Sequence, residues 1–332
     1  MRTPRPRAKI ARYTAPTLAV FAAAACAAVA GCNRGASPGL DWNDEVVKEI
    51  GAWRAEHEAD YRRDWATIEG LHFLKPGTHT AGSAANNDIV LTAALPQHIG
   101  RFTLADDAVT FDAEPGVLLT INGKAPAFAM TLRDDAADDA DEILVNGIRV
   151  VVHRTGERIA LRVRDPNGER ARAFRGFSWF PISRDYRVLG RFIKDSVPHE
   201  EHVINTFGDT DTYTSEGVVQ FTLKDQILRL RPFTTRPGHL YIVFKDASSG
   251  DETYEAARFL TAELRDDGTT ILDFNKAYNP PCAFNPFTTC PIPMRQNWLR
   301  MKVLAGEKKY AGHVDLPDAG SSSLRRADGA KP

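Results

Sequence analysis

The sequence is poor in the residue patterns that build metal centres. It holds four cysteines and nine histidines among 332 residues. Structural zinc takes four ligands, so Cys282 and Cys290 alone make a poor zinc site. The pair His199 and His202 has i,i+3 spacing, whereas a metalloprotease helix needs i,i+4 to place both rings on one side. We therefore predict no metal and no cofactor.

An excess of charge of one sign is also missing. The formal net charge is −1, with 42 basic against 43 acidic residues. Five of the basic residues lie before residue 13, and without them 37 basic residues face 43 acidic ones. A nucleic-acid partner would need a clustered basic face, so we predict none. The acidic run 134–142 lacks the glycine spacing of a calcium loop, which favours a solvated hairpin tip.

The first 31 residues resemble a lipoprotein signal peptide. A basic segment ends at Arg12, and the apolar run 15–30 is shorter than the roughly 20 residues that a membrane span needs. Residues 29–32, VAGC, match the lipobox of bacterial lipoproteins, which implies a lipid anchor on Cys32. Asn33 is not the aspartate that retains such proteins at the inner membrane. We expect an outer-membrane lipoprotein that faces the periplasm.

The rest of the chain predicts a mainly β protein with one N-terminal helix. Apolar residues spaced by threes and fours indicate the helix, and short alternating runs between turns indicate β-sandwiches. The polar stretch 164–178 suggests a domain boundary. The expected order is signal peptide 1–31, tether 32–42, amphipathic helix 43–64, first β-sandwich 65–165, C-terminal β-sandwich or barrel 175–312 and a disordered tail 316–332.

Part of the first sandwich resembles a forkhead-associated domain. The likeness is carried by PGTHTAGS at 76–83, NDIVL at 87–91, His98 and ING at 121–123. It implies a sandwich fold and, in true members, a phosphothreonine site. Ser83 stands where the phosphate-binding arginine is expected, and a phosphate dianion needs charge-assisted donors. The resemblance therefore implies the fold without phosphopeptide binding.

The stretch 273–297, DFNKAYNPPCAFNPFTTCPIPMRQN, is the candidate site. Its five prolines exclude a helix or a central strand, and its aromatic residues argue against disorder. A strand over 252–262 would place three polar side chains on one face and lead toward this loop. The candidate ligand-binding residues are Glu252, Tyr254, Arg258, Asp273, Asn275, Lys276, Tyr278, Asn279 and Cys282.

Purely structural roles for these residues are also open. Glu252 and Arg258 would also fit a solvated strand face with a weak ion pair. Asn275 and Asn279 would also fit amides that bond the loop's own backbone.

Cys282 and Cys290 allow three interpretations. A disulfide would close a short loop in an oxidising compartment. Two free structural thiols are the second possibility. A catalytic cysteine is the third, but it would need a nearby base, and the loop holds no histidine.

From about residue 44 to 310 the chain resembles a bacterial family of unknown function. The likeness is carried by WATIEGL at 65–71, RFL at 258–260 and above all DFNKAYNPPCAF at 273–284. The resemblance marks the loop as a site and implies no reaction. We expect a small molecule or an envelope component to bind through the loop. The alternatives are a hydrolase that acts on a cell-envelope substrate with Asp273 and Glu252 as acid and base, and a protein-interaction scaffold.

Overall fold

The computed structural model describes residues 40–312. The predicted signal peptide, Cys32 and the tail 316–332 lie outside the described residues. Over the described part the protein is mainly β with one long N-terminal helix, as predicted. No helix in this range is long and apolar enough to cross a membrane.

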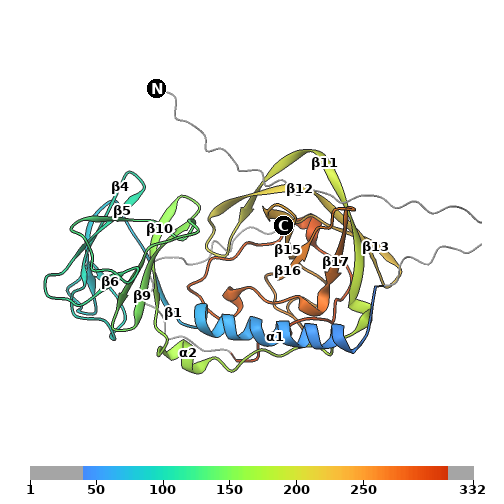
Figure 1. Ribbon diagram of the computed structural model, residues 1–332, viewed down its shortest axis with the longest axis horizontal. Coiled ribbons are helices and arrows are strands. Elements are labelled where there is room, and N and C mark those ends of the chain that lie inside the picture. Colours follow the sequence, from blue (N-terminus) through green and yellow to red (C-terminus); the bar gives the residue numbers. More distant parts are fainter. Residues whose placement is uncertain (1–39, 313–332) are drawn as a thin grey trace, which may run out of the picture. The chain divides into compact units, whose positions relative to one another are not determined.

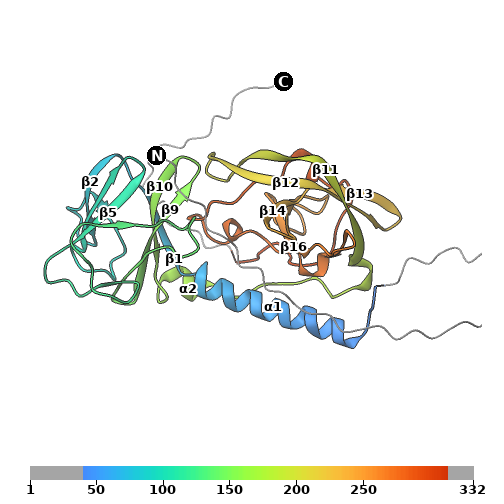
Figure 2. The ribbon, with the colours of Figure 1, turned by 45° about the horizontal axis from the view of Figure 1, so that its top comes forward.

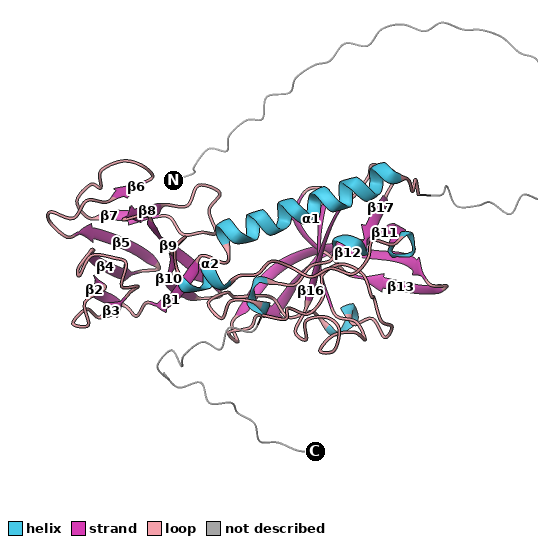
Figure 3. Cartoon of the chain, turned by 90° about the horizontal axis from the view of Figure 1, so that it is seen from below, coloured by secondary structure: helices cyan, strands magenta, loops and turns pink. Residues whose placement is uncertain are grey.

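Helix α1 (Asp44–Asp64) begins where its sequence favours a helix start. The Asn43 side chain caps it by accepting a hydrogen bond from the Val46 N–H at 3.0 Å. Acidic residues occupy its first turn and basic residues its last, which complements the helix dipole. In Figures 1 and 3 the helix lies along one side of the C-terminal strands.

Two five-stranded sheets form the first β-sandwich. Phe102 and Phe111 pack 4.7 Å apart at its centre, with buried aliphatic residues from both sheets around them. One sheet has the order β1 (Ile68–Phe73), β10 (Arg158–Arg164), β9 (Ile148–Thr155), β8 (Glu142–Val145) and β6 (Thr120–Ile121). The other has the order β3 (Ile89–Val90), β2 (Gly77–Gly82), β4 (Gly100–Ala105), β5 (Ala108–Ala113) and β7 (Met130–Leu132).

The residues that carry the forkhead-associated resemblance bind one another. His98 Nδ1 lies 2.8 Å from Asn87 Oδ1, and the Asn87 amide donates to the Gln97 carbonyl at 2.8 Å. Asp88 accepts from the backbone and the hydroxyl of Thr80. These contacts hold turns of the sandwich in place, so the motif residues have a structural role in this protein.

Two further sheets form the C-terminal β part. Figure 2 shows the long β11–β12 ribbon running over β14 and β16. Phe221, Phe244 and Phe274 lie in the core of this part. The first sheet has the order β13 (Gln226–Leu230), β12 (Thr210–Leu223), β11 (Arg187–Ile204) and β17 (Thr269–Asp273). The second has the order β14 (Phe233–Arg236), β15 (His239–Phe244) and β16 (Arg258–Glu263).

One predicted strand is wrong in extent. The predicted strand 252–262 begins only at Arg258, because residues 251–253 form turns closed by bonds to the Ser248 carbonyl and residues 254–257 have no regular structure. Residues 298–304 contribute only an isolated bridge between Trp298 and Lys245. The polar connection between the β parts also holds a short helix, α2 (Glu169–Ala173).

The 273–297 loop is ordered by three short 3-10 helices and by buried amides. The 3-10 helices are η2 (Phe274–Lys276), η3 (Pro281–Ala283) and η4 (Arg295–Asn297). The Asn285 amide donates to the Ile68 carbonyl at 2.7 Å, which ties the loop to the first sandwich. The prolines thus stiffen a segment that asparagine side chains anchor at several points.

Candidate functional site

Arg258, one of the predicted ligand-binding residues, is fully buried. Its guanidinium donates to Asp246 at 2.8 Å and to the Val303 carbonyl at 2.9 Å, and neither charged side chain is exposed. A ligand cannot reach it in this arrangement. The expected row of Glu252, Tyr254 and Arg258 on one strand face is wrong, because only Arg258 lies in a strand.

Asp273 and Asn275 hold the start of the loop. Asp273 pairs with Arg187 at 2.5 Å and caps η2 by accepting from the Asn275 N–H at 3.1 Å. The Asn275 side chain bonds both the N–H and the carbonyl of Ser183. Both side chains are buried, so they act as structural anchors.

Three other predicted residues lie apart from one another. Lys276 reaches Glu49 on α1 at 2.6 Å, and Glu252 pairs with Lys302 at 2.6 Å. The Tyr254 hydroxyl donates to the Cys282 carbonyl at 3.3 Å. Asp273 and Glu252 therefore have separate partners and do not form an acid–base pair.

Of the three interpretations of Cys282 and Cys290, the structure has both residues as free thiols. The Cys282 N–H points at Cys290 Sγ, 3.2 Å away. The neighbouring Cys290 sulfur and burial raise the pKa of the Cys282 thiol. This favours a neutral structural thiol over a nucleophile.

Tyr278 and Asn279 do line a cavity, which we call the loop cavity. It has a volume of about 480 Å³, within the range of small-molecule sites. It lies where α1, three strands and the loop meet. Its lining comprises His57, Asp60, Tyr61, Asp64 and Trp65 from α1 and its end, Tyr213, Tyr241 and Phe259 from strands, and Tyr278, Asn279, Pro281, Thr289, Cys290 and Pro291 from the loop.

Three residues of this lining carry a buried polar atom without a hydrogen-bond partner in residues 40–312. The atoms are His57 Nε2, the Tyr61 hydroxyl and Asn279 Oδ1. Tyr61 is 4% exposed and Asn279 is 2% exposed. An unsatisfied buried polar group costs about 1–3 kcal/mol. Eight such atoms occur in residues 40–312, and three of them belong to residues of this one cavity, which makes it the candidate ligand site.

The cavity offers neutral polar groups between aromatic walls. Burial lowers the pKa of His57 to about 4, so its imidazole is uncharged at neutral pH. Burial also raises the pKa of the Tyr61 and Tyr278 phenols, which stay protonated. The His57 ring lies 4.5 Å from the Tyr278 ring and 5.0 Å from that of Trp53.

Glu307 positions Asn279. Its carboxyl group is fully buried and accepts from the Asn279 N–H and side-chain amide, each at 2.9 Å. Burial raises the pKa of Glu307 well above its ordinary value. The amide oxygen of Asn279 is thereby held in one orientation beside the cavity.

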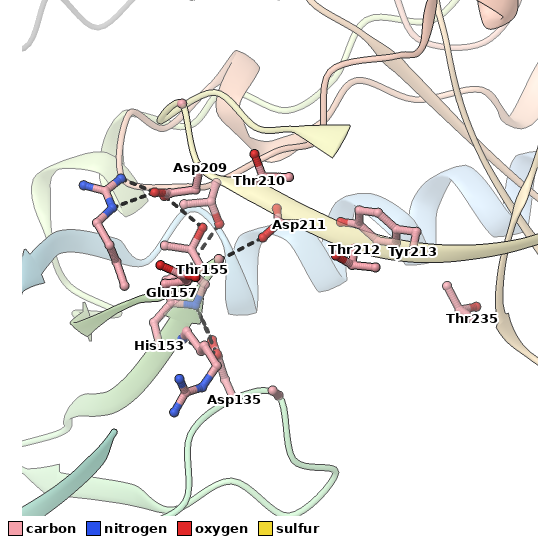
Figure 4. Close-up of a pocket in the computed structure, with 16 residues that line it drawn as sticks. Asp135, His153, Thr155, Glu157, Asp209, Thr210, Asp211, Thr212, Tyr213 and Thr235 are labelled. Atoms are coloured by element: carbon pink, nitrogen blue, oxygen red, sulfur yellow. Dashed lines mark hydrogen bonds and ion pairs between the residues drawn. The ribbon is translucent and has the colours of Figure 1, made fainter. Parts of the chain in front are cut away.

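A second, larger cavity adjoins the first, and we call it the hairpin cavity. It has a volume of about 1360 Å³ and shares Tyr213 and Thr289 with the loop cavity. Figure 4 shows its acidic and hydroxyl side chains around the β9–β10 turn and the start of β12. Arg158 pairs with Asp209 at 2.7 Å, and the Gly156 N–H donates to Asp211 at 3.0 Å.

The acidic run 134–142 was predicted as a solvated hairpin tip, and part of that prediction is wrong. Asp141 is buried against Arg133, and Asp134 pairs with Arg154. Asp135 meets His153 at 2.8 Å at the rim of the hairpin cavity. Asp135 also accepts from Arg162, 27 residues away in sequence, and the acidic run alone does not reveal such distant partners.

Sequence reasoning missed most of the cavity lining. His57 and Tyr61 lie in the predicted helix 43–64, none of whose residues was predicted as a site residue. Their i,i+4 spacing places them on one face, which was the available signal. Tyr213 and Tyr241 come from distant strands, and no local pattern marks them.

The fold and the site define a mainly β protein with a ligand-sized cavity beneath a proline-rich loop. Residues 172–308 match a family model described as "Protein of unknown function (DUF1684)". The matched range holds β11 to β17 and the whole 273–297 loop, whereas α1 and the first sandwich precede it.

Other comparisons add little to this assignment. No curated protein matches the chain. Six chains of solved structures match. One is the solution NMR structure of an uncharacterised protein of Haloarcula marismortui, 30% identical, which covers 44% of this chain and 82% of that chain with a TM-score of 0.37.

Proposed function

We propose that the protein binds an uncharged small molecule in the loop cavity. The observation that carries this proposal is the set of three unpartnered buried atoms on His57, Tyr61 and Asn279. A ligand that supplies donors and an acceptor to them would satisfy polar groups that the protein's own groups leave unpaired. Flat aromatic walls suit a ring in the ligand, because apolar faces stack on aromatic side chains.

An uncharged ligand fits the electrostatics of the lining. Its carboxylates come from Asp60 and Asp64, and Arg63 pairs with both. A bare anion would meet these carboxylates and the neutral imidazole of His57 without a cation from the lining residues to offset its desolvation. Neutral sugars, nucleosides and small esters are the classes to test first.

Two alternative functions have weaker support. An acid–base pair of Asp273 and Glu252 has no geometric basis, since Asp273 pairs with Arg187 and Glu252 with Lys302. A protein-interaction scaffold would require a partner face, whereas the unpartnered groups lie around a concave site. Small-molecule binding is thus the function that these contacts support best.

A thermal-shift screen of those three classes on the purified chain tests the proposal. Tyr61→Phe removes the unpartnered hydroxyl, so the ligand-free variant should melt at the same temperature as wild type or above it. The same variant should lose most of the ligand-induced rise in melting temperature, because the ligand bonds that hydroxyl.

Tyr186→Phe is the matched control. Tyr186 is also a buried tyrosine, but its hydroxyl accepts a hydrogen bond from Lys224 at 2.8 Å away from the cavity. This variant should melt slightly lower and keep the full ligand shift. A ligand shift that survives Tyr61→Phe unchanged would refute the loop cavity as the binding site.

We also propose that the chain is anchored to the outer membrane through Cys32 and faces the periplasm. The lipobox-like residues 29–32 support this. Metabolic labelling with an alkyne fatty acid should mark the wild-type chain and leave Cys32→Ser unlabelled. Label that persists on the variant would contradict a lipid on that cysteine.

A further inference from the structure

Three side chains from distant parts of the sequence form a chain of hydrogen bonds where the two cavities meet. His153 Nδ1 lies 2.8 Å from Asp135 Oδ2, and His153 Nε2 lies 3.1 Å from the Thr289 hydroxyl. His153 comes from β9, Asp135 from the connection between β7 and β8, and Thr289 from the 273–297 loop. Figure 4 shows His153 and Asp135 beside each other in the hairpin cavity.

The groups around Asp135 determine which ring nitrogen of His153 carries the proton. Burial disfavours its charge, but two partners outweigh burial and lower the pKa of Asp135: the hydrogen bond from His153 and the charge of Arg162, which donates to Asp135 Oδ2 at 2.8 Å. An ionised carboxylate only accepts, so Nδ1 of His153 carries the proton. Nε2 is then an acceptor, and the Thr289 hydroxyl donates to it.

Thr289 differs from its neighbour Thr288 in a way that matters for chemistry. The Thr288 hydroxyl is buried and donates to the Asn285 carbonyl at 2.9 Å, which is a structural bond. Thr289 is partly exposed, lines both cavities and has an imidazole as its partner. A hydroxyl beside a base that a carboxylate orients is the arrangement of an activated nucleophile.

We propose that Thr289 is the nucleophile of an ester hydrolase, with His153 as its general base and Asp135 as the residue that positions His153. The substrate class is a small uncharged carboxylic ester, because the adjoining loop cavity has aromatic walls and neutral polar groups. The choice of substrate class rests on the proposed binding function. The test labels Thr289 directly, so it can succeed or fail independently of any ligand in the loop cavity.

The reaction balances with water as the second reactant. Thr289 Oγ forms a bond to the ester carbonyl carbon while its proton passes to His153 Nε2. Collapse of the tetrahedral adduct breaks the bond to the leaving alcohol, which takes that proton from His153. Water then attacks the acyl-threonine and gives a proton to His153. The acid leaves, and the proton returns to Thr289 Oγ.

The protonation of His153 supports this role. Burial lowers the pKa of His153, and the nearby charges of Arg162 and Arg164 act in the same direction, while Asp135 opposes them. The neutral base form is thus available at neutral pH, as a general base requires. His153 is 6% exposed and fixed in the middle of a sheet, which holds its ring in place.

A fluorophosphonate probe tests the nucleophile on the full chain. Such a probe phosphonylates an activated hydroxyl and releases fluoride, and peptide mass spectrometry locates the adduct. We expect the adduct on Thr289, its absence in Thr289→Val and its retention in Thr289→Ser. His153→Gln should slow labelling at least 100-fold, which is the lower bound of typical general-base catalysis.

Thr235→Val is the matched control, because Thr235 also lines the hairpin cavity and is exposed. It should label at the wild-type rate. Labelling elsewhere, or labelling of Thr289 that His153→Gln does not slow, would overturn the proposal. Absence of labelling in both wild type and Thr289→Ser would overturn it as well, because both keep the hydroxyl.

The pH profile separates positioning by Asp135 from a purely structural role. The labelling rate should rise as His153 loses its proton. Asp135→Asn removes the negative charge that stabilises the imidazolium, so the midpoint should move to lower pH while the maximal rate falls. A variant that only loses thermal stability, with an unchanged midpoint, would show that Asp135 does not act through His153.

Discussion

His57 should make the stability of the protein depend on pH in a defined window. Burial among aromatic rings lowers its pKa from 6.5 to about 4, although the charges of Asp60 and Glu58 oppose the shift. The unfolded chain therefore takes up a proton at a higher pH than the folded one. Stability from the neutral ring is complete above pH 6.5 and is lost as pH falls toward 4.

The size of the effect follows from these two values. A shift of one pKa unit corresponds to about 1.4 kcal/mol, so the full loss is about 3 kcal/mol once pH lies below both values. At pH 5 the unfolded imidazole is almost fully protonated and the folded one is mostly neutral. His57 should then have lost about 2 kcal/mol of its contribution.

The assay is urea unfolding of wild type and His57→Phe at pH 7.5 and pH 5. Phenylalanine keeps a ring against Trp53 and Tyr278 but cannot bind a proton. The difference in unfolding free energy between the two proteins should change by about 2 kcal/mol between these pH values. Other titrating groups cancel in that difference. A change below about 0.5 kcal/mol would refute a neutral His57 in the folded protein.

Three further predictions concern buried residues of the C-terminal β part. Arg258→Met should lower the unfolding free energy by about 3–5 kcal/mol in urea titrations, because it leaves the buried Asp246 carboxylate without its partner. Glu307→Gln should remove the loss of stability that wild type shows as pH rises above about 4.5, because the raised pKa of Glu307 makes its folded state prefer the protonated form. Gly306→Ala should lower the melting temperature clearly, since φ is 76° there and an added Cβ would lie 2.2 Å from the Ala277 carbonyl oxygen.

The helix and the turns of the fold could be predicted from the sequence, because each depends on residues that are close together in the chain. The helix over 43–64 follows from apolar spacing, and the structure places it at Asp44–Asp64. The hairpin at Asn122 and Gly123 follows from two residues that tolerate positive φ, and both adopt it. The strand predicted from residue 252 was wrong because alternation alone cannot reveal a turn built on Ser248 hydrogen bonds.

The site was only partly accessible, because its members meet through tertiary packing. Tyr278 and Asn279 lie in the conspicuous loop and do line the cavity. Arg258 and Asp273 looked functional because charged residues near a polar loop suggest a cleft, yet Arg258 pairs with the buried Asp246, and Asp273 pairs with Arg187, 86 residues away in sequence. Asp135 lies in the acidic run and His153 lies 18 residues further along the chain, and only the structure brings them into contact.

The asparagines of the 273–297 loop explain why one segment can serve both anchoring and binding. Asn275, Asn285 and Asn297 each bond backbone groups outside the loop, which fixes its start, middle and end. The stretches between these anchors are short and rich in proline, so they have few conformations available. Tyr278 follows the first anchor, and Thr289 follows the second. A loop fixed in this way can hold a phenol and a hydroxyl at the two cavities without a helix or a strand beneath them.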